Sequence, residues 1–131
     1  MKIRLASPQD ETEIRRLLSQ DGYAWLRDLD WSAVYPFWLL VEEEKILAMI
    51  QMIQGRPVAH LEHLIVDESL PHIKRARAVR TLILSALQIL RGAGAQVVAG
   101  GIPFKLKHYK KILLKRGGFI VSSGHLVATK I

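Results

Sequence analysis

The feature of this sequence that most constrains its fold is a long amphipathic helical stretch between two strand-like segments. Apolar side chains recur three and four residues apart over residues 72–91, which is the spacing of one helix face. Residues 58–66 before it and residues 96–99 after it are short and rich in aliphatic side chains. Gly92 and Gly94 mark the end of the helix. A strand, a long helix and a strand in this order predict a crossover between two parallel strands.

The region before this unit is typical of hairpins. Residues 38–41, 46–53 and 58–66 are three consecutive strand-like segments, separated by an acidic turn after Val41 and by Gly55-Arg56-Pro57. Consecutive strands joined by short turns pair antiparallel, so the sheet is predicted to be mixed and mostly antiparallel.

The two ends of the chain complete the predicted order. Residues 2–5 are a short strand, and Ser7-Pro8 begins a helix that ends near Asp21-Gly22. The aromatic-rich residues 23–37 are a second short helix or an ordered loop. Residues 105–116 are a strongly basic helix, and residues 119–121 and 125–130 form a closing hairpin. The order β-α-(α)-β-β-β-α-β-α-β-β predicts one α/β (α+β) domain over residues 1–131, with helices flanking the sheet.

Composition excludes several classes of protein. The length of 131 residues suits one domain with its own core. Because the sequence has no cysteine, disulfides, thiolate catalysis and Cys-based zinc sites are excluded. No apolar run approaches the roughly 20 residues that a membrane span needs. We therefore expect a cytoplasmic protein without a membrane partner, either a monomer or a homodimer.

The charge of the chain is divided between its two halves. Residues 1–68 hold all twelve acidic side chains with seven Lys or Arg, whereas residues 69–131 hold twelve Lys or Arg and no acid. A uniformly basic half attracts anions such as nucleic acid, a phosphorylated cofactor or an acidic protein surface. The alternative is that these cations are ordinary solvated helix faces.

The order of elements and three short segments resemble the GNAT superfamily of acyl-CoA-dependent N-acyltransferases. Residues 59–67 resemble the family's fourth strand, residues 82–95 resemble the helix after its cofactor loop, and residues 115–119 resemble the Gly-Phe that opens its sixth strand. The resemblance implies a GNAT-like fold. It also implies acetyl-CoA, or another acyl-CoA, as cofactor and an amine as acceptor, either a protein lysine or N-terminus or a small molecule.

The cofactor loop departs from the family. The family carries Q/R-x-x-G-x-G/A there, because glycines let backbone N–H groups approach the pyrophosphate at a helix N-terminus. Residues 71–80 contain no glycine; Arg75 takes the Q/R position, and Ala78 and Arg80 take the glycine positions. Either basic side chains bind the phosphates, or the cofactor site is lost and only the fold remains. The cofactor-binding residues implied by the resemblance are Leu64, Ile65, Val66, Lys74, Arg75, Arg77, Ala78, Val79 and Arg80.

The last helix also departs from the family. The tyrosine that commonly serves as general acid for the departing thiolate is replaced by Leu114. Tyr109 lies in the same helix, five residues earlier, and is a candidate substitute. Helical geometry turns it away from the expected direction, which favours a packing role.

Glu62 is the predicted general base for the attacking amine. It lies mid-strand among apolar neighbours, in the segment that resembles the family's fourth strand, where members often carry a Glu. Strand alternation puts His60 on the same face as Glu62 and His63 on the opposite face. A salt bridge to a nearby Lys or Arg is the alternative role for Glu62.

Two further groups of residues bear on substrate binding and on metal binding. Trp25, Trp31 and Tyr35 could line a substrate entrance, although such aromatics more often close a core. His60 and His63 are three residues apart on a strand rather than four apart on a helix, so no metal site is predicted.

Three functions are compatible with the sequence. The first is an N-acetyltransferase, with the basic half around the cofactor and the acidic half facing a cationic amine. The second is a non-catalytic GNAT-fold binding or structural protein, of a kind that a phage or mobile element encodes. The third is nucleic-acid binding through the basic half, which phosphate contacts alone would make weak and salt-sensitive. Titration with acetyl-CoA separates the first from the others.

Overall fold

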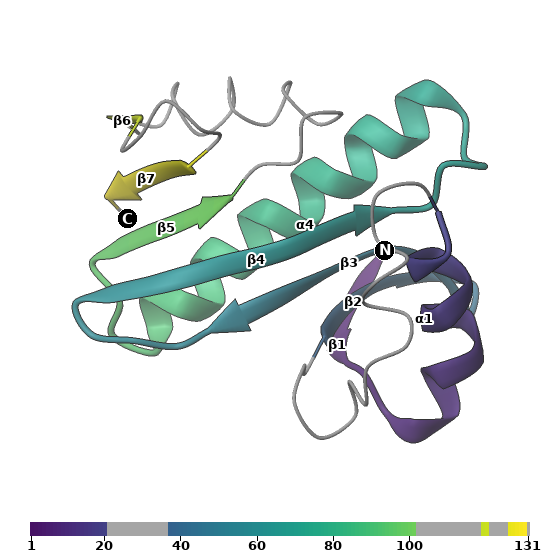
Figure 1. Cartoon of the computed structure of the whole chain (residues 1–131), viewed down its shortest axis with the longest axis horizontal. Coiled ribbons are helices and arrows are strands. Elements are labelled where there is room, and N and C mark those ends of the chain that lie inside the picture. The colour runs from purple at the N-terminus through teal and green to yellow at the C-terminus, as the bar shows by residue number, and fades with distance from the viewer. Residues whose placement is uncertain (21–36, 102–118, 121–125, 131) are drawn as a thin grey trace.

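A computed structural model describes residues 1–20, 37–101, 119–120 and 126–130 of the chain (Figure 1). The predicted second short helix and the predicted basic helix over residues 105–116 lie outside these ranges. Outside them too lie four candidate site residues, Trp25, Trp31, Tyr35 and Tyr109.

The described strands form one mixed sheet in the order β1-β2-β3-β4-β5-β7-β6. Their bounds are β1 Lys2–Leu5, β2 Phe37–Glu42, β3 Lys45–Ile53, β4 Val58–Val66, β5 Val97–Gly101, β6 Phe119–Ile120 and β7 Leu126–Lys130. Only β4 and β5 pair parallel among these strands, and the helix α4 (His72–Gly92) connects them. The predicted mixed, mostly antiparallel sheet with one crossover is confirmed.

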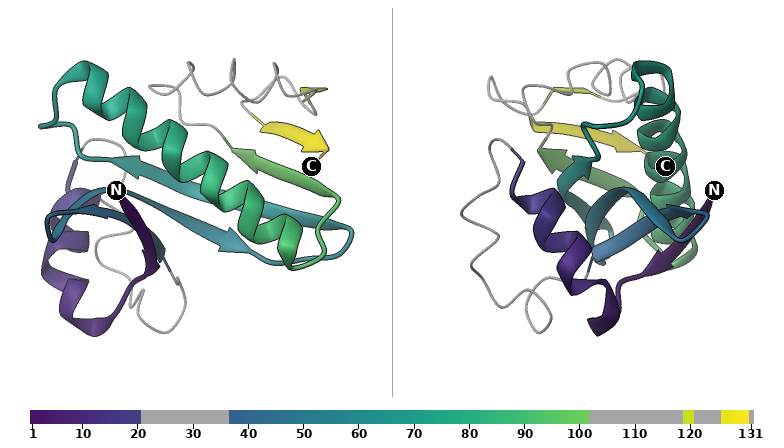
Figure 2. Two further views of the ribbon diagram at one scale, coloured as in Figure 1. Left: turned by 180° about the vertical axis from the view of Figure 1, so that it is seen from behind. Right: turned by 90° about the vertical axis from the view of Figure 1, so that its right-hand side faces the viewer.

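The two described helices cover opposite faces of the sheet (Figure 2). The helix α4 buries Val79, Leu82 and Leu90 against one face, together with alternate residues of β3 and β4. The helix α1 (Glu11–Leu18) buries Ile14, Leu17 and Leu18 against the other face. Each face of the sheet therefore buries an apolar cluster against one of the two helices.

The first helix is shorter than predicted. Pro8–Asp10 form a 3-10 turn, and α1 ends at Leu18 rather than near Asp21-Gly22. Asp10 accepts hydrogen bonds from the Ser7 backbone N–H and from both terminal nitrogens of Arg4. The Arg4 hydrogen bond lowers the pKa of Asp10 to about 2. These contacts join the start of the helix to β1.

The strand β5 extends further than predicted. The sequence predicted its end at residue 99, but Gly100 and Gly101 also lie in the strand and pair with β7. Gly100 also lies against β4, where an added Cβ would come 2.6 Å from the carbonyl oxygen of Leu61. The glycine therefore permits a close approach of two backbones instead of ending the strand.

Candidate functional site

The strands β4 and β5 pair along only half of β4. The ladder joins Val58–Leu61 to Val97–Gly100, and no described residue of β5 pairs with β4 beyond Leu61. The two strands separate towards their carboxyl ends, and β4 continues past β5 (Figure 1). The helix α4 begins at this same end of the sheet. We call residues 62–66 the open half of β4 and residues 58–61 its paired half.

The open half begins with a β-bulge. Gln51 of β3 pairs with Glu62, but Met49 pairs with Ile65, so β4 contains one residue more than β3 across this interval. His63 has a φ of 51°, in the left-handed region that non-glycine residues seldom occupy. The extra residue changes which face the following side chains occupy: Ala59 and Leu61, and then Leu64 and Val66, pack on the α4 side.

The bulge brings His63 to the face that carries Glu62, and the prediction that His63 lies on the opposite face is wrong. Gln51 is the cross-strand partner of Glu62, so the two side chains share a face. The His63 Nδ1 atom lies 2.9 Å from Gln51 Oε1. The prediction from strand alternation failed because it assumes that each residue of β4 faces one residue of β3. The bulge adds an extra residue to β4 and so breaks this alternation.

Burial lowers the pKa of the His63 imidazole, and the negative charge of Glu62 partly opposes this. The ring is partly buried, and Gln51 beside it is 6% exposed. An imidazole whose pKa is lowered in this way is mostly neutral at neutral pH.

Glu62 and His60 lie as predicted on one face of β4. Glu62 is partly buried and His60 is exposed. Within the described part of the chain no Lys or Arg forms an ion pair with Glu62, so the salt-bridge alternative has no support there.

The cofactor-binding residues predicted at the end of β4 are buried. Leu64 and Val66 belong to the α4-side core, and Ile65 belongs to the α1-side core. Their side chains therefore serve packing, and any contact with a thioester would come from the backbone.

A buried carboxylate that the sequence analysis did not single out fixes the end of the open half. Asp67 is fully buried and accepts hydrogen bonds from the Ser69 backbone N–H and hydroxyl, at 3.0 and 2.7 Å. Arg16 of α1 donates to its other oxygen at 3.0 Å. Burial alone would raise the pKa of Asp67, but the Ser69 and Arg16 bonds hold it below its usual range. The one sign of this role in the sequence is that Asp67 directly follows an apolar strand.

The basic residues implied as phosphate ligands lie in the first turns of α4. The helix begins at His72, so Ala78 and Arg80 are well inside it and not in a loop. Ala78 and Val79 are fully buried, whereas Arg77 and Arg80 are exposed. The glycine-free sequence is rich in Ala, Arg and Lys, which favour helix, and this explains why the segment continues the helix.

The amino end of α4 has several features of an anion site. Its first turn contains no acid and its N-cap Pro71 provides no capping side chain, so the first N–H groups lack that partner. Arg75 donates to Nδ1 of His72 at 2.8 Å, while its buried Nε has no hydrogen-bond partner among the described residues. Lys74 forms an ion pair with Glu42 at 2.6 Å. These residues suit a phosphorylated ligand.

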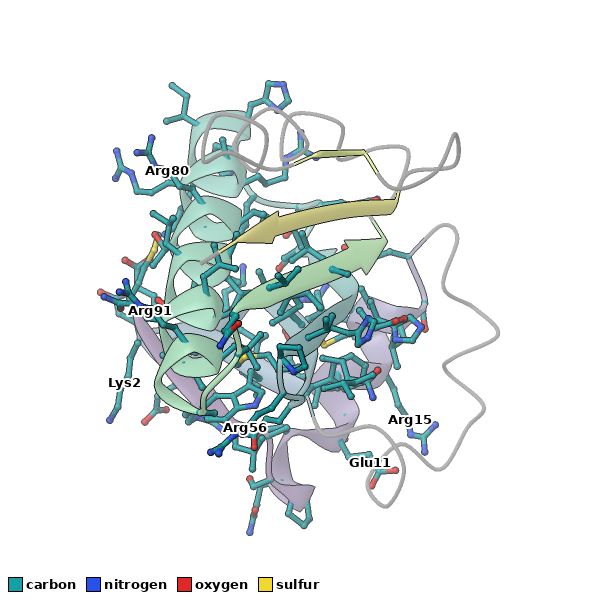
Figure 3. The ribbon with its side chains drawn as sticks, turned by 90° about the vertical axis from the view of Figure 1, so that its left-hand side faces the viewer. Lys2, Glu11, Arg15, Arg56, Arg80 and Arg91 are labelled. Carbon is teal, nitrogen blue, oxygen red and sulfur yellow. The ribbon has the colours of Figure 1, made fainter. Side chains whose placement is uncertain are left out.

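The cationic side chains continue along α4. Arg80 and Arg91 are exposed and extend from the helix on its outer side (Figure 3). Among the described residues no group of three or more His, Asp or Glu could hold a metal ion, and no helix is long and apolar enough to cross a membrane.

Comparison with known proteins identifies the fold. No protein-family model and no curated protein sequence matches the chain. Solved structures do match: Ard1 from Thermoplasma volcanium has 18% identity and a TM-score of 0.71, covering 99% of this chain and 97% of its own. PaiA N-acetyltransferase from Thermoplasma acidophilum, in complex with coenzyme A, has 14% identity and a TM-score of 0.69, with full coverage of both chains. An acetyltransferase from Bacillus subtilis, also with CoA, has 15% identity and a TM-score of 0.70, covering 99% and 98%.

The architecture and these neighbours define an acetyltransferase-type fold. The particular fold is that of the GNAT acetyltransferases, as the resemblance in the sequence implied.

Proposed function

We propose that this chain is an N-acyltransferase that moves an acetyl group, or another acyl group, from acyl-CoA to an amine. The observation that carries the proposal is the end of the β4–β5 ladder at Leu61 and Gly100, on the side of the sheet where α4 begins. An extended arm that enters between two separating strands can reach both their backbones and the helix N-terminus. Two structural neighbours of this fold are complexes with coenzyme A.

The amino end of α4 would hold the phosphates. The positive charge there comes from Arg75, Arg77 and Arg80. Lys74 is also cationic, but it forms an ion pair with Glu42. The unpartnered Nε of Arg75 and the first N–H groups of the helix supply hydrogen-bond donors where the family uses glycine-loop backbone. The residues present therefore fit a phosphorylated cofactor despite the missing glycines.

The open half of β4 would hold the reacting groups. The backbone of Leu64, Ile65 and Val66 would polarise the thioester carbonyl, and Glu62 with His60 would stand near the amine. Tyr109 is the proposed proton donor to the thiolate, and Trp25, Trp31 and Tyr35 are the proposed substrate contacts. The acceptor would be cationic, because the acids of the chain all lie in residues 1–68.

The test is calorimetric titration of the chain with acetyl-CoA, with a DNA duplex as the control ligand. We expect saturable heat with acetyl-CoA that weakens as salt is added. No heat at high micromolar acetyl-CoA would contradict the proposal, and heat with DNA alone would favour a nucleic-acid-binding protein.

A pair of arginine variants tests the phosphate site. Arg75→Ala should weaken acetyl-CoA binding about 10- to 150-fold, because a charged hydrogen bond contributes roughly 1.5–3 kcal/mol. Arg91→Ala is the matched control, since it removes the same charge from the last turn of the same helix. Equal losses in both variants would indicate general electrostatic attraction and not a site.

One observation favours a second function. The positions that the family gives to glycines are helical in this chain, and Ala78 is in the core. A non-catalytic GNAT-fold binding protein would tolerate this change. Such a protein would release no thiol from acetyl-CoA with any amine.

A further inference from the structure

The end of α1 reaches the loop that joins β4 to α4. Gln20 follows the C-cap Ser19 of α1, and its side-chain carboxamide forms two hydrogen bonds with the backbone of β4 and the loop. Its Nε2 atom donates to the carbonyl oxygen of Val66 at 3.0 Å, and its Oε1 atom accepts from the backbone N–H of Glu68 at 2.8 Å. The end of α1 therefore lies beside the carboxyl end of β4 (Figure 2).

Gln20 bonds to the edge of β4 that faces away from β3. On the β3 side, the Asp67 N–H donates to the carbonyl oxygen of Leu47 at 2.9 Å. The peptide bond between Val66 and Asp67 is trans, so its carbonyl points in the opposite direction to its N–H. That direction is the side of β4 on which β5 lies in the sheet. The Gln20 amide therefore lies on the edge that β5 leaves unpaired.

The two bonds of Gln20 reproduce the bonding pattern of a parallel strand. In a parallel ladder, one residue donates to a carbonyl of the neighbouring strand and accepts from the N–H two residues further along that strand. The Gln20 amide does this with Val66 and Glu68. The strand β5 pairs with β4 only as far as Leu61. The open half of β4 is therefore bounded by β5 at one end and by the Gln20 side chain at the other.

The loop that Gln20 holds determines where α4 begins. Only residues 67–71 separate β4 from α4. Leu70 in this loop is buried in the core on the α4 side. The N–H of Arg75 then donates to the carbonyl oxygen of Pro71 at 2.9 Å, which forms the first turn of the helix. Because the loop is short and packed into the core, a shift at its start is transmitted to the amino end of α4.

We propose that Gln20 is a positioning residue for the cofactor of the proposed transfer. Its two bonds hold residues 67–71 so that the first N–H groups of α4 and the Arg75 guanidinium face the phosphates of acyl-CoA. This inference rests on the proposed function. Arg16, one turn earlier in α1, holds the same loop through the Asp67 carboxylate at 3.0 Å. In this role Gln20 touches neither the thioester nor the amine, so it sets the affinity for the cofactor and not the rate of the chemical step.

The first experiment measures acetyl-CoA affinity by calorimetry in the wild-type chain, Gln20→Met and Gln88→Met. Met is of similar length but its thioether is only a weak acceptor, so Gln20→Met removes both bonds. Gln88 is exposed on α4 and provides the matched control for the same chemical change. We expect Gln20→Met to raise the Kd about five- to tenfold and Gln88→Met to leave it within about twofold. An unchanged Kd in Gln20→Met would overturn the role of Gln20.

The nucleotide half of the cofactor shows where Gln20 acts. The probe is 3′-phosphorylated ADP, which carries the phosphates of CoA without the arm. Its Kd should rise in Gln20→Met by the same factor as that of acetyl-CoA. A loss confined to acetyl-CoA would place the effect on the arm and overturn the positioning of α4. At saturating acetyl-CoA the kcat of thiol release should stay within about twofold of wild type, whereas a merely structural defect would lower it.

A further variant and a direct measurement of the contact complete the test. Gln20→Asn keeps the amide but is one methylene shorter, so it is too short to reach both backbone groups and should weaken binding as Gln20→Met does. Hydrogen exchange at the Glu68 amide reports the bond itself. We expect faster exchange in both Gln20 variants and the wild-type rate in Gln88→Met.

The outcomes separate the two proposals. Wild-type exchange at Glu68 in Gln20→Met would overturn the role of Gln20 and leave the proposed function in place. A wild-type chain that binds no acetyl-CoA would overturn the proposed function, and the role of Gln20 with it.

Discussion

The two halves of β4 belong to one continuous strand but differ in how they pair with the neighbouring strands. The paired half, Val58–Leu61, pairs with β5 along its whole length and with β3 at His60 and Leu61, in regular register. The open half keeps only β3 as a described partner, contains the bulge and ends at the buried Asp67. The open half contains Glu62 and His63, and the paired half contains His60 as its one titratable side chain. A strand that loses one neighbour presents on that side the backbone N–H and C=O groups that a fully paired strand uses for the ladder.

The largest effect is expected from removal of the carboxylate that fixes the open half. Asp67→Ala removes three hydrogen bonds to a fully buried side chain. We expect the free energy of unfolding to fall by about 2–4 kcal/mol, measured by urea denaturation. Glu11→Ala is the matched control: it also removes a carboxylate from an α1 arginine, Arg15, in an exposed pair (Figure 3). That pair should contribute at most about 0.5 kcal/mol.

The same carboxylate predicts a pH dependence. The pKa of Asp67 is lowered in the folded state, so its contribution to stability is present above its unfolded pKa of about 3.9. It is lost as the pH falls through the lower folded pKa. The stability difference between wild type and Asp67→Asn should be constant from about pH 5 to 7 and shrink below about pH 4. A difference that grew towards acid pH would contradict the assigned hydrogen bonds.

The second-largest effect on stability is expected at Leu61 and Gly100, the last pair of the β4–β5 ladder. Gly100→Ala places a methyl group 2.6 Å from the Leu61 carbonyl oxygen, so one strand must move. We expect a loss of about 1–3 kcal/mol in the free energy of unfolding. Gly101→Ala is the control one residue along, where an added Cβ meets nothing within 4 Å. Equal stability of the two variants would mean that the strands part before Leu61.

The sequence predicted the paired half better than the open half. The bounds of β4 and the start of α4 were predicted correctly, because local periodicity and helix propensity determine them. The face of His63 was predicted wrongly, because a bulge depends on how β4 registers against β3. The one local sign was the apolar spacing, which shifts from Ala59 and Leu61 to Leu64 and Val66.

The proposed cofactor site was only partly predictable for a similar reason. A family motif aligned without its glycines identified the basic residues, and these lie at the amino end of α4. The motif assumes a loop at Ala78 and Arg80, whereas the apolar spacing over residues 72–91 already predicted a helix there, and the structure has one. Spacing could not reveal the Arg16–Asp67 bond, which joins residues 51 apart in the chain.

The smallest effect on stability is expected at the turn between β2 and β3. Glu43 and Glu44, between β2 and β3, have φ values of 50° and 64°, where two-residue hairpin turns favour Asn-Gly. Glu44→Gly should therefore raise the free energy of unfolding by roughly 0.5–1 kcal/mol, whereas Glu44→Gln, which keeps the Cβ, should not. The neighbouring Glu42 holds Lys74 at the start of α4. If Glu44→Gly stabilises the chain and also weakens acetyl-CoA binding, the strained turn serves to place Glu42 against the proposed phosphate-binding end of α4. Unchanged binding would assign the strain to the hairpin alone.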